Sequence, residues 1–397
     1  MEHGFPAVAG LVSGRAGALA MSAIKEMSIL SAKIPDAASL AWGLPSFPTP
    51  APIRAAVAAA LEQDPKVGMY ALPGGLPELL TAAAEEHARR TGIRVDPERR
   101  VLITAGNMEG LQVLFQALID HGDEIIVTDP GFVSHISQIE FSGGRPVFWK
   151  MDEARGWDLD IEALPGLITD RTKAIVLVNP SNPTGAILSE TTLRAAAKIA
   201  RDHGLLIIID DPYSPFVYDD PEGVFHLASV PEFASHVAYL FTFSKAYAMS
   251  GWRAAYMVLP EALRTEAVKI HDLTMICTPR ISQVAAHAAL TTPAMHLDEF
   301  RAILNRRRTL ICERLDGVSH VFDYVRPQGA YYVFPKILVE HDSDRQFALD
   351  LLEKAHVTVT PGSAFGPSGS GHVRMAFCVE DDMINRAFDR IETYFGR

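Results

Sequence analysis

The sequence predicts an α/β fold: a mostly parallel, seven-stranded sheet between helices, followed by a smaller α+β domain. Two observations predict it. Seven short apolar runs recur between residues 101 and 259, and most are separated by stretches with the polar faces of surface helices. Past about residue 285, long charged stretches precede isolated short apolar runs. With 397 residues, the chain has room for two or three domains of ordinary size.

The expected strands are continuous apolar runs rather than alternating ones, which is typical of parallel strands buried on both faces. They are residues 101–104, 124–129, 146–149, 174–179, 205–210, 237–243 and 254–259. Residues 188–204 are typical of the intervening helices, because they end on Gly204, a common C-capping residue. Another helix is expected over residues 18–33.

We expect three segments along the chain. Residues 1–50 would form an N-terminal arm and part of the small domain, and they include a loop rich in Gly and Pro at 42–50. Residues 51–285 would form the large domain that contains the sheet. Residues 286–397 would form the small C-terminal domain, with charged helices over about 283–316 and short strands near 331–334 and 373–377.

Composition excludes several function classes. The net charge of −12 argues against a nucleic-acid surface and against binding to anionic membranes. No apolar run reaches the roughly 18 residues of a membrane span, and no basic stretch with a following apolar run predicts a signal peptide. The three cysteines are far apart and form no CxxC pair, which suits a reducing cytosol, so we expect a cytoplasmic protein and no metal site.

The strand ends indicate a ligand. In an open parallel sheet, ligands bind beyond the carboxyl ends of the strands. Those ends carry a glycine before a helix, an aromatic ring, an amide, a carboxylate with a phenol, and an amine: Gly106, Phe132, Asn182, Asp210 with Tyr213, and Lys245. The common GxGxxG and GxxxxGK[ST] motifs are absent. One ligand would match these residues if it had a phosphate, a flat ring, a phenolic oxygen, a ring nitrogen and an aldehyde. Pyridoxal phosphate has all five groups.

Three of these residues would face the cofactor ring. Asp210 would keep the ring nitrogen protonated; alternatively it caps the following turn, although a carboxylate that ends an apolar run needs a partner. Tyr213 would hydrogen-bond the phenolic oxygen, or it is ordinary packing. Asn182 would donate to the same oxygen, or it belongs to a plain turn in NPSNPTG.

Other residues would hold the phosphate and the ring face. Gly106 lets the backbone approach a phosphate at the start of a helix. Arg253 would add a fixed cation and Ser244 a hydroxyl. Phe132 would stack on the ring, although a lone Phe after a strand is more often core.

Lys245 would provide the reactive amine. A neutral amine is needed to form a Schiff base with the aldehyde, and desolvation lowers the pKa of an amine toward that state. Once released, the same amine could move a proton at the substrate α-carbon. Taken alone, Lys245 would more often be a surface lysine whose stem is buried; the other strand ends favour the catalytic interpretation.

Motifs along nearly the whole chain give it a family resemblance. They are GLPSFPTP (43–50), Tyr70 with Gly74, NPSNPTG (179–185), DDPY (210–213), SKAYAMSGWRAAY (244–256), QGAYYVFP (328–335), PGSAFG (361–366) and HVRMAF (372–377). With these motifs the chain resembles the class I/II aminotransferases, the aspartate aminotransferase family of fold-type I pyridoxal-phosphate enzymes.

The resemblance implies an aminotransferase that moves the α-amino group of an amino acid to a 2-oxo acid. It would do so through a Lys245 aldimine with pyridoxal 5'-phosphate and a pyridoxamine phosphate intermediate. Asp210 would bind the pyridine nitrogen, and Tyr213 and Asn182 the phenolic oxygen. The phosphate would be held by Gly106, Asn107, Met108, Ser244 and Arg253.

The resemblance also implies a substrate pocket and a dimer. Arg374 would grip the substrate α-carboxylate, although alone it could as well be a surface ion pair. Gly43 would offer its backbone to the same carboxylate, and Trp42 would line the pocket. Tyr70 would reach the phosphate of the neighbouring subunit, which implies a homodimer with shared active sites.

The sequence departs from the commonest family pattern at four places. Asp211-Pro212 could stiffen the turn to Tyr213, and Asn107-Met108 replace small or hydroxyl residues. Phe132 replaces Trp or Tyr. Arg280 stands where many relatives have Ser or Thr; it could neutralise a second substrate carboxylate or pair with a local acid, and we slightly favour the local pair.

Two other functions are compatible with the motifs. A carbon–sulfur lyase or a cyclopropane-forming synthase would use the same fold, lysine and cofactor. A ligand-binding or regulatory protein could also have kept the fold. Such regulators usually carry an N-terminal DNA-binding domain, whereas here only some 40 non-basic residues precede the family region.

Overall fold

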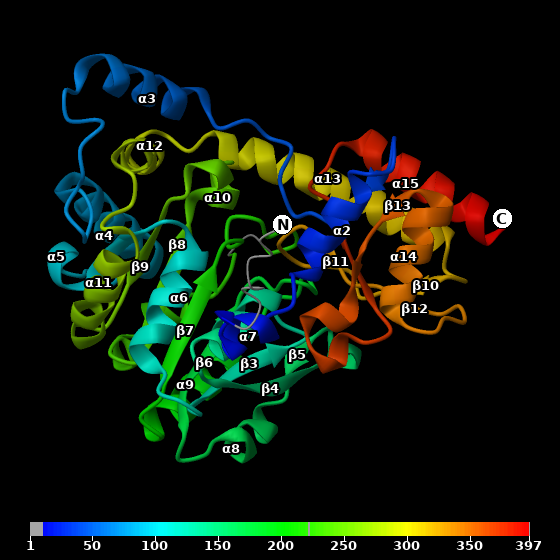
Figure 1. The fold of residues 1–397 in the computed structure, drawn as a ribbon, viewed down its shortest axis with the longest axis horizontal. Coiled ribbons are helices and arrows are strands. Elements are labelled where there is room, and N and C mark those ends of the chain that lie inside the picture. The colour runs from blue at the N-terminus through cyan, green and yellow to red at the C-terminus, as the bar shows by residue number, and fades with distance from the viewer. Residues whose placement is uncertain (1–10, 221–222, 397) are drawn as a thin grey trace, which may run out of the picture.

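The computed structural model describes residues 11–220 and 223–396. Its centre is an eight-stranded sheet in the order β2-β9-β8-β7-β6-β3-β4-β5 (Figure 1). The strands are β2 Val101–Thr104, β3 Glu124–Asp129, β4 Arg145–Asp152, β5 Asp158–Leu159, β6 Thr172–Val178, β7 Leu206–Asp211, β8 Val237–Thr242 and β9 Ala255–Val258. The first ten residues of the expected N-terminal arm lie outside the described residues.

The mostly parallel sheet is confirmed, and each of the seven expected strands is present to within three residues at either end. Strands β4, β3, β6, β7 and β8 run parallel, while β9 lies antiparallel between β8 and β2. The eighth strand, β5, was not predicted. It pairs with β4 through two residues only, too few to form a recognisable apolar pattern.

Helices cover both faces of the sheet, and each face has its own apolar core. On one face, α6 (Asn107–Leu118), α7 (Val133–Phe141) and α11 (Glu261–Met275) pack against the strands. On the other face lie α3 (Ala51–Gln63), α4 (Pro77–Thr91), α9 (Glu190–Asp202) and α12 (Arg280–Thr291). Because side chains alternate along a strand, neighbouring residues of β7 belong to different faces. Ile208 joins the first core, and Ile207 and Ile209 join the second.

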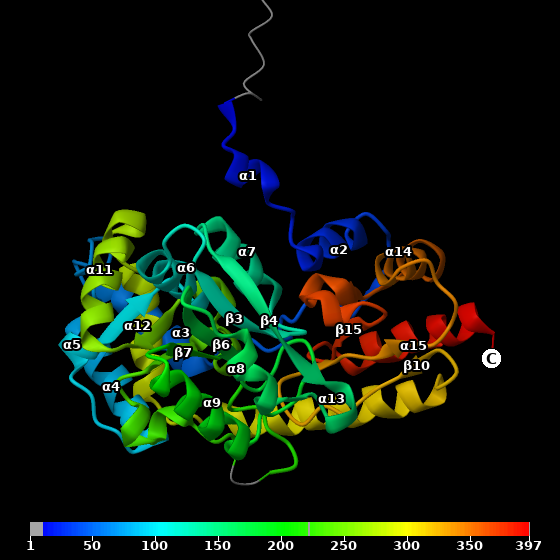
Figure 2. The same cartoon turned by 90° about the horizontal axis from the view of Figure 1, so that it is seen from below.

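A third core brings the start of the chain together with its last third. Helix α2 (Ala23–Ser31) packs there with α14 (Asp344–Ala355) and α15 (Asp381–Phe395), and the long helix α13 (His296–Gly317) leads to it from the sheet (Figure 2). The short strands of this part are β1 Ala38–Ser39, β10 Phe322–Asp323, β11 Tyr332–Val333, β12 Lys336–Ile337, β13 Val357–Thr358, β14 Thr360–Pro361 and β15 Val373–Ala376. Strand β1 pairs with β13, across more than 300 residues of sequence.

The helix predictions are mostly confirmed, with one difference near the N-terminus. The helix expected over 188–204 is α9, capped by the Ser189 side chain, and Gly204 follows it with a positive φ of 69°. The single helix expected over 18–33 is instead a short α1 (Gly14–Ala18) and then α2. Extended residues lie between them, and Ser22 precedes the first turn of α2. The remaining short helices are α5 (Pro97–Arg100), α8 (Leu164–Leu167) and α10 (Phe243–Ala246).

Candidate active site

Lys245 lies where β8 ends and the short helix α10 begins. The Thr242 side chain caps this helix by accepting from the Ser244 N–H, which fixes the turn that carries the lysine. The Lys245 side chain is partly buried, and its amine donates to the Gly43 carbonyl oxygen at 2.8 Å. Burial lowers the pKa of Lys245 to about 8, and the positive charges of Arg374 and Arg253 add to this effect. A larger fraction of the amine is therefore neutral near pH 7 than in an exposed lysine.

Asp210 is buried near the end of β7 and accepts on both carboxylate oxygens. The Asn107 side-chain amide donates to Oδ1 at 2.6 Å, and His135 Nε2 lies 3.1 Å from Oδ2. Asn107 begins α6 and His135 lies in the first turn of α7, so two of the three helices named on this face orient the carboxylate. One carboxylate is therefore held rigidly at the carboxyl edge of the sheet, with two partners that fix its plane.

Tyr213 belongs to a cluster of three buried tyrosines. Its hydroxyl lies 3.0 Å from the Tyr332 hydroxyl, and its ring meets the Tyr331 ring edge-on at 5.2 Å. Burial raises the pKa of Tyr213 far above its ordinary value, so the phenol stays protonated and can donate a hydrogen bond. Tyr331 itself donates to the Gly43 carbonyl oxygen, which connects this cluster to the acceptor of the Lys245 amine.

A backbone cradle follows β2. Gly106 has a positive φ of 86°, and a Cβ added there would lie 2.6 Å from Arg253 Nη2. Arg253 donates to the Ala105 carbonyl oxygen at 2.9 Å and presents its charge at the cradle. The first N–H groups of α6, on Asn107 and Met108, have no acceptor inside the helix, so they can bind an anion. The Asn107 side chain is turned to Asp210, so its backbone is the group aimed at the cradle.

Arg374 lies on β15 with its guanidinium buried beside Asn182. Its Nη1 donates to Asn182 Oδ1 at 3.0 Å and its Nη2 to the Ala41 carbonyl oxygen at 2.5 Å. The Tyr332 ring lies against the guanidinium at 4.5 Å. The Arg374 Nε is buried and has no hydrogen-bond partner. Since a buried donor without an acceptor is costly, this nitrogen is a candidate for binding an anionic ligand.

Gly43, Ser244 and Phe132 lie around this centre. Gly43 is buried, and a Cβ there would collide with the Tyr332 hydroxyl, so only glycine fits. Ser244 is buried and accepts from the Thr242 hydroxyl at 2.9 Å. Phe132 precedes α7 and meets the His135 ring edge-on at 5.3 Å. Trp42 is exposed, and so is Tyr70, at 75%.

Arg280 begins α12 and has a local acidic partner. Its Nε lies 3.4 Å from Asp64 Oδ2 at the end of α3. This geometry agrees with the local pair favoured from the sequence. Its side chain is 18% exposed, so the pair is near the surface.

Three residues of the site, His135, Tyr331 and Tyr332, were not singled out from the sequence. His135 follows no strand directly, and only its position three residues after Phe132, on the same helical turn, could have suggested it. Tyr331 and Tyr332 lie inside the QGAYYVFP motif, but nothing in that motif says which of their hydroxyls lies beside the Tyr213 hydroxyl.

These groups fit pyridoxal phosphate. The cradle at Gly106 offers N–H groups and the Arg253 charge to a phosphate. Asp210 offers a carboxylate to a ring nitrogen, and Lys245 offers an amine with a lowered pKa to an aldehyde. The unpartnered Arg374 Nε offers a donor to a substrate carboxylate.

Comparisons with known proteins identify the family. The family model described as "Aminotransferase class I and II" matches residues 36–391. The chain is 34% identical to an aspartate aminotransferase of Pyrococcus horikoshii over 94% of both chains. It is 31% identical to aromatic-amino-acid aminotransferase 2 of Thermococcus litoralis, over 94% of this chain and 95% of that one.

A solved structure extends the likeness to the fold. The aspartate aminotransferase of Thermus thermophilus with maleate superposes with a TM-score of 0.91 at 32% identity, over 96% of this chain and 99% of that one. The prediction of an aminotransferase is confirmed. The chain belongs to the class I and II aminotransferases, pyridoxal-phosphate enzymes of fold type I that move an amino group between an amino acid and a 2-oxo acid.

Proposed function

We propose that the residues described above carry out the transfer in the roles expected from the sequence. One observation carries the proposal: the Lys245 amine, with its pKa lowered to about 8, lies among a fixed carboxylate, an anion cradle and a buried arginine. Asp210 would hold the ring nitrogen. Tyr213 and Asn182 would contact the phenolic oxygen, and Phe132 the ring face.

The chain's own groups then determine which bond of the amino acid reacts. Bound pyridoxal phosphate supplies an aldehyde and an electron-withdrawing ring that stabilises negative charge at the substrate α-carbon. Arg374 would bind the α-carboxylate, with Gly43 and Trp42 bordering the same pocket, which orients the α-proton toward Lys245. The neutral Lys245 amine would accept that proton and deliver it to the carbon that the cofactor's aldehyde contributes.

The phosphate would be bound by the Gly106 cradle together with Asn107, Met108, Ser244 and Arg253. The free N–H groups at the start of α6 and the Arg253 cation support this role.

A homodimer is the second part of the proposal. Large apolar side chains are exposed on the segment before α4 and at the end of α11: Met69 61%, Tyr70 75%, Leu72 65%, Leu273 87% and Ile276 42%. Such a group of exposed apolar residues is typical of a protein interface. A second copy of the chain would cover them and would receive Tyr70 at its own phosphate cradle.

We also infer a cytoplasmic protein with the domain division 1–50, 51–285 and 286–397. Cys277, Cys312 and Cys378 are all buried free thiols, as expected in a reducing compartment. In the described part of the chain, no helix is both long and apolar enough to cross a membrane. The apolar core that joins α2 to α13–α15 supports grouping the N-terminal arm with the last segment.

Lys245→Ala tests the proposal. We expect the variant to lose the visible absorbance of the covalently held cofactor and to lose transfer activity, because no other described group takes the place of the amine. Absorbance and release of 2-oxo acid in a single turnover would be measured, with the exposed Lys269→Ala as the matched control. Turnover retained by Lys245→Ala would refute the assignment.

A further inference from the structure

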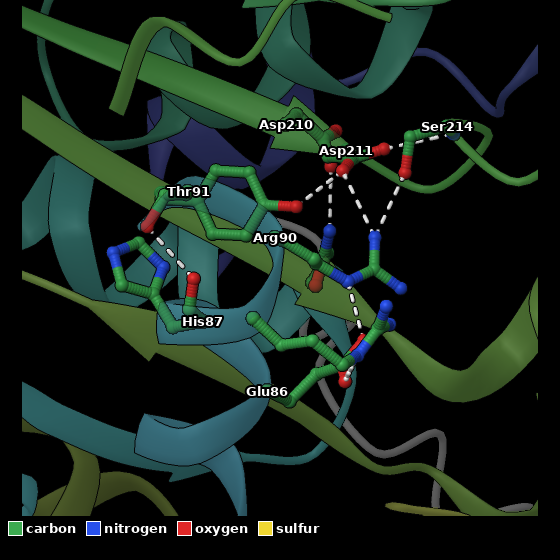
Figure 3. Close-up of polar contacts among 10 residues, drawn as sticks. Glu86, His87, Arg90, Thr91, Asp210, Asp211 and Ser214 are labelled. Atoms are coloured by element: carbon green, nitrogen blue, oxygen red, sulfur yellow. Dashed lines mark hydrogen bonds and ion pairs between the residues drawn. The ribbon is translucent and has the colours of Figure 1, made fainter. Parts of the chain in front are cut away.

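Asp211 follows Asp210 on β7 but faces the other side of the sheet. Asp210 contacts α6 and α7, whereas Asp211 lies beside α4 on the opposite face (Figure 3). Its side chain is only 2% exposed. A buried carboxylate needs partners, and those of Asp211 are not part of the site described above.

The Asp211 carboxylate closes the turn that carries Tyr213. Its Oδ1 accepts from the Ser214 N–H at 2.9 Å. Its Oδ2 accepts from the Tyr239 hydroxyl and lies 3.8 Å from Arg90 Nη1. The backbone on either side of Tyr213 is therefore tied to a single carboxylate.

Arg90 contacts both ends of this turn. The same Nη1 that faces Asp211 donates to the Ser214 hydroxyl at 3.0 Å. From the other side, Arg90 Nε donates to Glu86 Oε1 at 2.6 Å. The guanidinium also lies over the Phe241 ring at 4.2 Å. Figure 3 shows Arg90 between Glu86 on one side and Asp211 with Ser214 on the other.

The charges in this network depend on one another. Arg90 and Glu86 are each 9% exposed, so Arg90 is a buried cation between two buried carboxylates. Burial alone would raise the pKa of Glu86. Hydrogen bonds from Arg89 and the charge of Arg90 outweigh this effect, so the pKa of Glu86 is lowered. Removing one member of such a set leaves a buried charge unpaired, which is costly. The Asp211–Ser214 turn would then move so that the charge gains another partner.

We propose that Arg90 is a positioning residue that fixes the segment from Asp210 to Ser214, and with it the Tyr213 hydroxyl, from the face of the sheet opposite the active site. The inference rests on the proposed role of Tyr213 at the phenolic oxygen of the cofactor. It adds a requirement that the site itself does not reveal: the position of Tyr213 depends on a residue of α4 that does not touch the cofactor.

The chemistry of arginine is part of this inference. Arg90 uses a planar fork to reach Glu86 with one nitrogen and the Asp211–Ser214 turn with another. A lysine has a single ammonium and cannot hold both sides in that geometry, although it keeps the charge. Arg90→Lys therefore separates position from charge.

The test compares Arg90→Lys with Arg89→Met and Tyr213→Phe in the cofactor-loaded enzyme. Arg89 binds the same Glu86 but is 69% exposed and contacts nothing in the turn, so Arg89→Met is the matched control. We expect kcat of Arg90→Lys to fall roughly 10- to 100-fold, the range for a misplaced catalytic group, with KM changed less than about threefold. Arg89→Met should keep both within about twofold.

A spectroscopic measurement distinguishes positioning from loss of stability. A hydrogen bond from Tyr213 would favour the unprotonated phenolic oxygen, so its loss should raise the pH midpoint of the cofactor's visible absorbance change. The shift measured for Tyr213→Phe gives the size expected when this hydrogen bond is lost completely. Arg90→Lys should shift the midpoint in the same direction, Ser214→Ala less so, and Arg89→Met not at all. Ser214→Ala removes one hydroxyl only and keeps the test available if Arg90→Lys does not fold.

The outcomes separate this inference from the proposed function. A shift in Tyr213→Phe with none in Arg90→Lys or Ser214→Ala would overturn the positioning role and leave the role of Tyr213 intact. Equal losses in Arg90→Lys and Arg89→Met would overturn it as well, because they would indicate a general effect of disturbing α4. No shift in Tyr213→Phe would refute the role of Tyr213 itself, and this inference with it.

Discussion

The half of the site at the edge of the sheet differs from the half beside β15 in how its charged side chains are partnered. In the first, the cofactor half, Asp210 has a partner on each oxygen and Arg253 is bound to the Gly106 loop. In the second, the carboxylate half, Arg374 is buried with Nε unpartnered. Its other nitrogens meet a loop carbonyl oxygen and an amide.

The difference indicates two kinds of binding. The cofactor half is built from the ends of strands in one sheet and from the first turns of the helices that follow them. Its geometry therefore exists before any ligand binds. The carboxylate half joins residues far apart in the sequence, such as Ala41 and Arg374, and its arginine has one buried nitrogen, Nε, without a partner. We therefore expect mutations in the cofactor half to slow the chemistry and mutations in the carboxylate half to weaken substrate binding.

The largest effect in this comparison is expected for Asp210→Asn. The amide keeps the shape of the side chain but carries no charge to hold a protonated ring nitrogen. We expect release of the substrate α-proton to slow by roughly 100- to 1,000-fold, as when a charge-stabilising group is removed from an active site. Exchange of the α-proton with deuterated solvent would be followed by NMR.

Two readouts keep this result interpretable. The visible absorbance of the bound cofactor should persist, since Lys245 and the phosphate cradle are untouched. The amino-acid concentration that gives half saturation should change less than about threefold, because the carboxylate half is intact. An unchanged exchange rate in fully loaded Asp210→Asn would remove the reason for calling this half catalytic.

The cofactor half was also the part that the sequence predicted best. Apolar runs locate the strands, and their carboxyl ends meet at one edge, so Asp210 and Lys245 could be placed near each other from the pattern alone. The partners of these groups come from other elements. His135, a partner of Asp210, lies on a helix, and the apolar pattern of that helix does not indicate that a polar side chain on it will meet a carboxylate at the end of a strand.

The carboxylate half depended more on resemblance than on pattern. Arg374 lies on a four-residue strand and Gly43 in a loop near residue 50, and their meeting requires the N-terminal segment to pack beside β13 and β15. The collision that a Cβ at Gly43 would make with Tyr332 explains why glycine is needed there. Such a contact between residues about 290 positions apart cannot be read from local sequence.

A second, smaller effect is expected for Arg374→Gln. The glutamine amide can still meet the Asn182 oxygen but offers no positive charge to a carboxylate. Since hydrogen bonds to charged groups contribute about 1.5–3 kcal/mol each, half saturation by amino acids should need roughly 100-fold more substrate. The concentration for half saturation would be measured by titrating the enzyme with amino acid and following the absorbance change of a single turnover.

An amine without a carboxylate provides the control for Arg374→Gln. Its affinity should be the same in the variant and in the unaltered enzyme, because the missing charge has nothing to bind. Equal loss of affinity for the amine and for the amino acid would mean that Arg374 supports the fold of this half rather than its ligand.

The smallest effect is expected for Arg280→Met, which tests how far the carboxylate half extends. Arg280 has Asp64 as a partner at 3.4 Å, and both side chains are partly exposed, so little stability depends on the pair. We expect the unfolding midpoint to change by no more than about 2 °C. The ratio of kcat/KM for aspartate to that for an aromatic amino acid should stay within about twofold, because Asp64 already occupies the arginine. A selective fall for aspartate of about tenfold or more would instead bring Arg280 into the pocket, as the cation for a second substrate carboxylate, and would widen this half to include α12.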